Sequence, residues 1–317
     1  MRRVHDIDLK LLRTFRAIVE AGGLVGAQLT LNVSQSTLST QLADLEKRLG
    51  FRVCYRGRSG FALTKAGQQT YDACGDLFSA ADRFQNTAAS ISGELKGVLR
   101  LGIADAMITN RAWDLSAILG EFNDRAKKTV IEIFMDSPGN MERLVIEGAR
   151  DVTIAGAFTR KTVGVVYIPL FSEQHAIFCA NDHPLASQEL VETAELKRYA
   201  FVARRYLHRY DLERVGHLNP GAVVEEIESQ ALLIQSGRFI GYLPVHYADI
   251  LPSLTRVRTT DGTDYYSPFY LLHKTNAEEN LLVRNFVNRV REFKIRKSAQ
   301  HSQSIQPLEG GIDRKRR

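Results

Sequence analysis

Uncharged hydrogen-bonding side chains gather in one short stretch of the sequence. Amides and hydroxyls both donate and accept hydrogen bonds, which is the chemistry needed to contact base edges in a DNA major groove. Two arginines follow in a glycine-rich turn, where they could contact the DNA backbone or minor groove, or could simply be solvated turn charges. The candidate DNA-binding residues are Ser34, Gln35, Ser36, Thr37, Thr40, Gln41, Arg56 and Arg58.

Two adjacent arginines point to a second kind of chemistry. Arg204 and Arg205 follow a predicted strand and could hold a carboxylate, with Ser137 donating from another loop. They could instead be solvated, or pair with Asp211 and Glu213. Ligands of α/β sheets bind beyond the carboxyl ends of strands. The candidate effector-binding residues are therefore Ala104, Asp105, Ser137, Pro138, Gly139, Phe158, Arg204, Arg205 and Tyr206.

Enzymatic chemistry finds little support in the sequence. The eight histidines are dispersed, the three cysteines have no metal or disulfide spacing, and glycine-rich nucleotide motifs are missing. His183 and His208 are more simply loop residues than catalytic bases. We therefore predict no catalytic residue, no metal site and no cofactor.

The hydrogen-bonding stretch lies on two predicted helices. Apolar residues have helical spacing in residues 24–31 and again from Leu38 to Leu49, and Ser34 stands where it would cap the second helix. Asp8 is expected to cap a preceding helix, and residues 51–63 alternate like two strands around a turn. The pattern predicts a winged helix-turn-helix over residues 7–64, although an ordinary helical hairpin would share the central part.

A long helix is predicted next, over residues 65–92. Its small and apolar residues step by alternating threes and fours, which is the seam of a two-stranded coiled coil. A homodimer through this helix would present two recognition helices to an inverted repeat in double-stranded DNA, while the alternative is a helix packed on its own chain. The seam consists of Ala66, Thr70, Ala73, Leu77, Ala80, Phe84, Ala88 and Ile91.

Residues 97–295 alternate between short apolar strands and helices. This alternation predicts a parallel sheet with helices on its faces, and the length suffices for two small α/β lobes. Two separate strands are expected at Val163–Leu170 and His175–Ala180. The fold class is thus α/β with an N-terminal winged helix-turn-helix and a two-lobed effector domain.

Charge is concentrated at the two ends of the chain. Residues 1–66 carry 11 Lys and Arg against 5 Asp and Glu, residues 67–295 carry 25 against 29, and residues 296–317 carry 6 against 2. A basic amino-terminal segment suits phosphate contact, whereas an acidic middle does not. The last segment is predicted to be a disordered basic tail. With no membrane-length apolar run and no secretory signal, we expect a cytoplasmic protein.

The chain resembles the LysR-type transcriptional regulators from about Ile7 to Phe293. The motifs that carry the resemblance are residues 32–39 (NVSQSTLS), 45–50 (LEKRLG), 63–67 (LTKAG), 181–186 (NDHPLA) and 237–244 (GRFIGYLP). The resemblance implies a winged helix-turn-helix, a dimerising linker helix, and a two-lobed domain like periplasmic solute-binding proteins with a small effector between the lobes. It also implies a dimer of dimers.

The sequence departs from the usual family pattern at several positions of the DNA-binding segment. Members commonly have Ser or Thr at positions matching Gly23 and Val25, alanine at Gln28, proline at Ser36 and arginine at Thr40. The departures leave the operator sequence open. Two other functions also stay open: a solute-binding protein, which would need export, and an architectural DNA-binding protein, which would leave the two lobes without a role.

Overall fold

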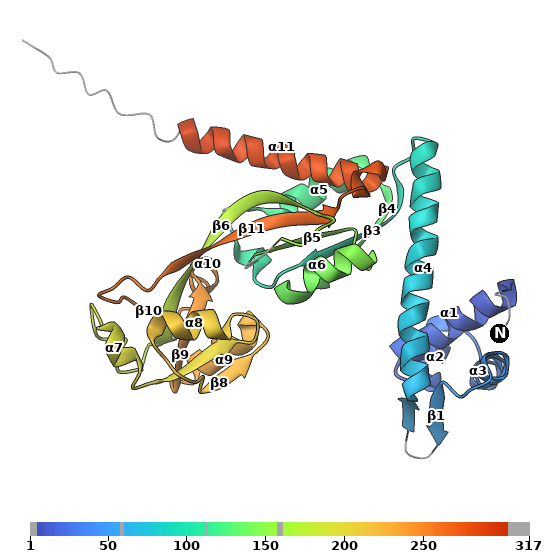
Figure 1. Ribbon diagram of the computed structural model, residues 1–317, viewed down its shortest axis with the longest axis horizontal. Coiled ribbons are helices and arrows are strands. Elements are labelled where there is room, and N and C mark those ends of the chain that lie inside the picture. Colours follow the sequence, from blue (N-terminus) through green and yellow to red (C-terminus); the bar gives the residue numbers. More distant parts are fainter. Residues whose placement is uncertain (1–4, 58–59, 112, 157–160, 304–317) are drawn as a thin grey trace, which may run out of the picture. The chain divides into compact units, whose positions relative to one another are not determined.

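The computed structural model describes all residues except 1–4, 58–59, 112, 157–160 and 304–317. Within this description the chain divides into two compact units, one ending at Phe84 and the other beginning at Gln85 (Figure 1). Each unit has its own hydrophobic core. No helix in the described part of the chain is both long and apolar enough to cross a membrane.

The first unit is a winged helix-turn-helix, as the sequence predicts. Three helices pack their apolar faces together, with Phe15, Leu38 and Leu45 fully buried, and Phe78 of a fourth helix closes the same core. The wing is a two-stranded antiparallel hairpin. The elements are α1 (Asp6–Glu20), α2 (Leu24–Leu31), α3 (Gln35–Leu49), β1 (Cys54–Gly57), β2 (Gly60–Leu63) and α4 (Lys65–Ile91).

Asp8 is not at the N-cap position that the sequence predicts, but it does take part in capping the first helix. His5 is the N-cap residue, and Asp8 lies three residues inside, where its carboxylate accepts a hydrogen bond from the His5 backbone N–H at 2.8 Å. Its other oxygen accepts from Arg48 Nη1 at 2.9 Å, although Asp8 is only 1% exposed. These bonds hold the pKa of Asp8 below its usual range, the His5 bond having the largest effect. Asp8 therefore ties the start of α1 to the end of α3.

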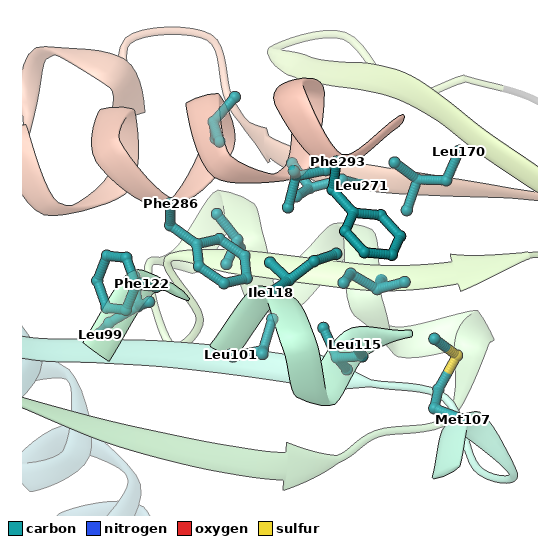
Figure 2. Packing of buried hydrophobic residues seen from close by; sticks show 14 of the residues in the cluster. Leu99, Leu101, Met107, Leu115, Ile118, Phe122, Leu170, Leu271, Phe286 and Phe293 are labelled. Carbon is teal, nitrogen blue, oxygen red and sulfur yellow. The ribbon is translucent and has the colours of Figure 1, made fainter. Parts of the chain in front are cut away.

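The second unit contains two lobes joined by long strands (Figure 1). In the first lobe, β3 lies between β4 and β5, parallel to both, and α5 and α11 cover an apolar core. Figure 2 shows Phe122 of α5 and Phe286 of α11 meeting in this core, with ring centroids 5.5 Å apart. The elements are β3 (Lys96–Ile103), η1 (Met107–Thr109), α5 (Leu115–Arg125), β4 (Lys128–Met135), α6 (Pro138–Glu147), β5 (Val152–Gly156), η2 (Ala277–Glu279) and α11 (Leu281–Gln303).

The second lobe has two smaller cores on either side of its strands. Strands β7, β8 and β9 are mutually parallel, while β10 pairs antiparallel to β6. Its elements are α7 (Thr193–Leu196), β7 (Ala200–Arg204), α8 (His208–Val215), β8 (Ala222–Val224), α9 (Ile227–Gln235), β9 (Phe239–Pro244), α10 (Val245–Ala248) and β10 (Leu254–Val257).

Two predictions about the sheet are wrong. The sheet is mixed rather than parallel, because β11 (Tyr265–Lys274) runs antiparallel to β5 and β6, and β6 runs antiparallel to β9. The two strands expected between Val163 and Ala180 form one strand, β6 (Val165–Ala180), which belongs to both lobes. A polar segment at its centre, residues 172–174, looks like a turn in the sequence but continues the strand, where it pairs with β11.

The predicted boundary of the C-terminal tail is also wrong. Helix α11 continues to Gln303, so residues 296–303 are helical. Arg296 even donates to the Glu121 carboxylate of α5 at 2.5 Å. The remainder of the predicted tail, residues 304–317, lies outside the described residues.

Gly67 provides a test of the junction between the wing and α4. Its N–H donates to the Thr64 hydroxyl at 2.8 Å, and a Cβ at Gly67 would stand 1.7 Å from the Val53 carbonyl oxygen. Since that contact is with backbone, we expect Gly67→Ala to lower the free energy of unfolding by more than about 2 kcal/mol. Thermal unfolding followed by circular dichroism measures the effect.

Gly75→Ala is the matched control on the same helix. A Cβ at Gly75 would meet nothing within 4 Å. Alanine is the better helix former by about 1 kcal/mol, so this variant should be as stable as the wild type or more so. Equal stability of the two variants would contradict the packing at Gly67.

Candidate functional sites

The predicted base-contacting residues lie at the start of α3. Ser34, Gln35, Ser36, Thr37 and Thr40 are all exposed, while the leucines on the opposite side of the helix are buried. Ser34 is the N-cap residue, as predicted, and its hydroxyl accepts from the Thr37 backbone N–H at 3.3 Å. The helix thus presents a row of small polar side chains to solvent, which suits entry into a major groove.

The remaining DNA candidates differ from this group. Gln41 is half-buried, and its side-chain oxygen accepts a hydrogen bond from the Thr14 hydroxyl at 2.9 Å, which orients it toward α1. Arg56 lies on β1, but its side chain is not described, and Arg58 lies outside the described residues. Of the eight candidates, the five at the start of α3 are therefore the ones whose exposure is established.

Glu46 positions the wing, although sequence reasoning assigned it no role. Its carboxylate on α3 accepts from the backbone N–H groups of Val53 at 2.9 Å and Cys54 at 3.4 Å. These bonds fix the start of β1 against the end of α3. The signal was available in the sequence, since Glu46 belongs to the LEKRLG motif.

Helix α4 exposes most of its predicted seam. Ala73, Leu77, Ala80, Phe84, Ala88 and Ile91 are exposed, whereas Ala66 and Thr70 are half-buried. Phe84 and Ile91 are 75% and 84% exposed, which is unusual for large apolar side chains. A different face of the helix buries Cys74 and Phe78 in the first core. From Ala73 onward, the seam is therefore left exposed by the single chain.

A small cavity lies where the lobes of the second unit meet, with a volume of about 20 Å³. This is room for little more than one water molecule, so an effector can enter only if the lobes move apart. Eight of its lining residues lie in or beside the first lobe or on the long strands, and the other four belong to the second lobe. The lining consists of Ala104, Asp105, Pro138, Gly156, Glu173, His175, Arg204, Tyr206, Leu207, Ile227, Ser267 and Phe269.

Arg204 is the cation of this interlobe cavity. It is only 2% exposed, and its guanidinium donates to the Tyr206 hydroxyl at 3.0 Å and the Tyr265 hydroxyl at 3.3 Å. Within the described structure its Nε–H has no acceptor. Burial raises the pKa of Tyr206 to about 12, so the phenol keeps its proton at neutral pH. The pair can offer a ligand donors from both side chains.

Glu173 organises the other side of the cavity. Its two carboxylate oxygens lie 3.0 Å from His175 Nε2 and 2.8 Å from His246 Nε2. Burial raises the pKa of Glu173, but these hydrogen bonds outweigh burial and bring it down to about 2. Burial also lowers the pKa of His175, whose Nδ1 faces Arg204 Nη2 at 3.4 Å. The glutamate thereby fixes the histidine beside the arginine.

The predicted effector residues are only partly brought together. Ala104, Asp105, Pro138, Arg204 and Tyr206 line the interlobe cavity. Ser137 and Gly139 are exposed beside it without lining it, and Phe158 lies outside the described residues.

Arg205 does not belong to the interlobe cavity. Its side chain is 66% exposed and pairs with Glu225 at 2.9 Å. Successive residues of a strand and its extension point to opposite sides. The side chain of Arg205 therefore points to solvent, whereas that of Arg204 points into the cavity. The predicted clamp of two arginines is therefore wrong, and one buried arginine remains.

Asp105 links the two lobes across the cavity. Its carboxylate, at the end of β3, accepts from the Ile227 backbone N–H at the start of α9, at 2.6 Å. Burial raises the pKa of Asp105, although this bond opposes the rise. Because the bond joins one lobe to the other, it can exist only while the lobes are closed.

Among the residues that the structure describes, no three His, Cys, Asp or Glu side chains gather closely enough to hold a metal ion. Cys54, Cys74 and Cys179 are buried, and none of them forms a disulfide.

The geometry defines a class of protein that combines a winged helix-turn-helix with a two-lobed α/β domain containing a cavity between its lobes. Residues 9–68 match the family described as "Bacterial regulatory helix-turn-helix protein, lysR family", and residues 92–294 match "LysR substrate binding domain". The second match alone spans more than half of the sequence. The chain belongs to the LysR family of transcriptional regulators.

Relatives of known sequence agree with this membership. The HTH-type transcriptional activator BauR of Pseudomonas aeruginosa is 31% identical over 293 residues, covering 91% of this chain and 96% of that protein. The HTH-type transcriptional regulator YtlI of Bacillus subtilis is 25% identical, covering 70% and 71%. A probable hydrogen peroxide-inducible genes activator of Mycobacterium xenopi is 31% identical, covering 57% and 93%.

Solved structures share the fold at lower sequence identity. The LysR family regulator CbnR matches with a TM-score of 0.65 at 17% identity, covering 90% of this chain and 99% of CbnR. Full-length BenM matches with a TM-score of 0.52 at 20% identity, covering 92% and 97%. CbnR has also been solved in complex with its target DNA.

The buried hydrogen bonds of Glu173 predict a pH dependence of stability. Its carboxyl has a pKa of about 2 in the fold, against an ordinary value of 4.5. The stability that it contributes is complete above pH 4.5 and is lost as the pH falls toward 2. Glu173→Gln should lower the free energy of unfolding at neutral pH by roughly 2 kcal/mol and flatten its decline in that acid range.

Denaturant unfolding at a series of pH values, followed through the second unit, measures both effects. Glu225→Gln is the control, since its pair with Arg205 is exposed and should matter by less than about 0.5 kcal/mol. An unchanged acid slope in Glu173→Gln would show that the histidine pairs do not stabilise the carboxylate.

Proposed function

We propose that this regulator senses a small organic anion in the interlobe cavity and converts lobe closure into a change in how paired heads hold their operator. The observation that carries the proposal is Arg204, a buried cation with an unpaired Nε–H. A buried guanidinium is the preferred protein partner of a carboxylate, because it donates two parallel hydrogen bonds in fixed geometry.

The neighbours of Arg204 support this role. Tyr206 accepts from Arg204, and its own hydroxyl proton has no acceptor among the described residues, so it remains available to a ligand oxygen. Tyr265 instead donates to Asp211 at 3.0 Å, which fixes it as a support for the guanidinium. One hydroxyl therefore serves binding, and the other holds the arginine in position.

Coupling to DNA requires that the ligand prefer one lobe arrangement over another. The Asp105 bond to the Ile227 N–H provides a contact that differs between arrangements. A ligand that fills the cavity while keeping this bond favours closure, whereas a bulkier ligand that breaks it favours opening. The two-lobed domain then affects DNA binding by shifting the populations of its open and closed arrangements, and it does not need to contact the DNA.

On the DNA side, we propose a homodimer through the exposed seam of α4 and, in the manner of the family, a dimer of dimers. Leu77, Phe84 and Ile91 recur every seven residues, which is the spacing of a coiled-coil seam. Two copies related by a twofold axis present their α3 helices to an inverted repeat in double-stranded DNA.

Peroxide sensing, suggested by the name of the mycobacterial relative, has less support. Burial raises the pKa of both Cys74 and Cys179 to about 11, so at neutral pH they are thiols rather than the reactive thiolates. Cys54 is likewise buried. A buried, protonated thiol is a poor nucleophile toward peroxide.

The proposed DNA contact predicts a loss of sequence discrimination in Gln35→Ala. Gln35 is exposed at the first position of α3, where its amide can pair with a base edge. Operators are first selected from random duplexes, and affinities are then measured against unrelated DNA. The variant should lose specific affinity by about tenfold while nonspecific affinity stays unchanged.

Gln68→Ala is the control, because Gln68 is exposed on α4 and bonded to Asp72 at 2.9 Å. It should bind the selected operator like the wild type. If the wild type itself discriminates no duplex from competitor DNA, the protein is architectural rather than a specific regulator.

The proposed effector site predicts opposite outcomes for neighbouring arginines. In a thermal-shift screen of small organic acids, Arg204→Gln should abolish the stabilisation seen with the wild type, and the exposed Arg205→Gln should retain it. Loss of binding equivalent to about 2 kcal/mol, or thirtyfold, is expected for a buried charged hydrogen bond. Equal thermal shifts of both variants with the same acid would contradict an anionic effector bound by Arg204.

A further inference from the structure

A second cavity lies in the first lobe, apart from the interlobe cavity, and has a volume of about 430 Å³. It is bounded by the ends of β3 and β4, by η1, by the start of α5 and by α11. No residue lines both cavities. This volume accommodates a small organic molecule without any rearrangement.

The wall of this first-lobe cavity is mainly apolar. Ile103, Met107, Leu115, Leu119 and Ile133 all line it. Figure 2 shows Met107 and Leu115 toward one end of the row of core side chains. A ligand with a hydrocarbon body would remove this surface from water, which is the main source of affinity in such cavities.

The polar lining carries an excess of positive charge. Arg111 and Lys297 bring two cations, against the single carboxylate of Asp114. That carboxylate caps α5, accepting from the Ala117 N–H at 3.0 Å and the Ser116 hydroxyl at 2.6 Å. These hydrogen bonds, with that of Ser116 the strongest, lower the pKa of Asp114. One positive charge therefore remains for a ligand.

Trp113 supplies an independent observation. The side chain is only 2% exposed, lines the cavity, and stacks on Phe171 with ring centroids 5.6 Å apart. Its indole Nε1–H has no acceptor in the described structure and is itself shielded from solvent, so a ligand in the cavity would contact the ring rather than this donor. A bound molecule would therefore change the surroundings of the indole.

We propose that the first-lobe cavity is a second ligand site, which binds an amphipathic organic anion with its acidic group toward Arg111 and Lys297 and its hydrocarbon body against the apolar wall. The occupant would touch Met107, in the short segment after Asp105 that also holds Thr109 against His246 at 2.8 Å. It would therefore act on the same segment that links the two lobes.

Trp113 is the single tryptophan of the chain, so its fluorescence reports on this cavity in the full-length protein. The probes are octanoate, the uncharged octanamide, and acetate, which lacks the apolar body. We expect a saturable change with octanoate, a much weaker response to octanamide, and none to acetate. Lys297→Gln should weaken octanoate binding about tenfold, as loss of a charged hydrogen bond predicts.

Matched variants separate this site from its alternatives. Arg284→Gln removes an exposed cation elsewhere on α11 and should bind octanoate normally. Ile108 lines the cavity and is 97% exposed, so its substitution cannot disturb the core. Ile108→Asp should weaken octanoate binding through like charge, and Ile108→Asn should weaken it less.

Arg204→Gln, which alters the interlobe cavity, should leave octanoate binding unchanged. A failure of the proposed interlobe site therefore does not affect this test. Equal affinity for octanamide, or unchanged octanoate binding in Lys297→Gln, would overturn the proposal. So would an octanoate affinity that falls as protein concentration rises, since that would show a second copy of the chain covering the cavity.

Discussion

The rest of the structure depends on helix α4, because different faces of this one helix contact different parts of the chain. Its Cys74 and Phe78 complete the core of the first unit. Further along, Asn86 bonds both polar groups of the Val98 backbone, at 2.8 Å and 3.2 Å, and so fixes the start of β3. What remains is a row of exposed apolar side chains, among them Phe84, that water solvates poorly. We propose that a second copy of the chain buries that row.

The elements that sequence patterns predicted well are those with a strong local cause. Helical spacing of leucines gave α3, and the hydroxyl at Ser34 gave its first residue, because the N-cap bond is made within one turn. Asp8 was misplaced by three residues because it caps the helix from the third helical position, through its bond to the His5 N–H. Its second bond, to Arg48, joins residues forty apart in the sequence, and such long-range pairing leaves no local signal.

The same limit explains what was missed in the effector site. Glu173 lies in a polar segment that looks like a turn, and only its pairing with His175 and His246 makes it a buried part of β6. Arg204 and Arg205 are chemically identical in the sequence. Strand geometry alone decides that the first is buried and the second exposed, and the register of a strand within a sheet is set by distant neighbours. The presence of an arginine in the effector site was therefore easier to predict than which of the two arginines faces the cavity.

The DNA-binding unit and the two-lobed unit of this regulator depend on different interactions. Small polar side chains on α3 are the proposed base contacts, and a single short helix contributes little affinity, so the proposed duplication through α4 would make specific binding effective. In the second unit, the proposed effector would act by favouring one lobe arrangement over another around the buried Arg204. Helix α4 belongs to both units, because Phe78 packs in the core of the first unit and Asn86 bonds the backbone of β3 in the second.

The most direct measurement is a footprint of Phe84→Glu on a selected operator, together with its molar mass in solution. Phe84 is 75% exposed, so the substitution leaves both cores intact. The account predicts a folded chain of reduced mass that loses the footprint over both half-sites, while the neighbouring exposed Gln85→Glu keeps wild-type mass and footprint. A Phe84→Glu protein that retained the oligomeric mass and protected both half-sites would contradict it.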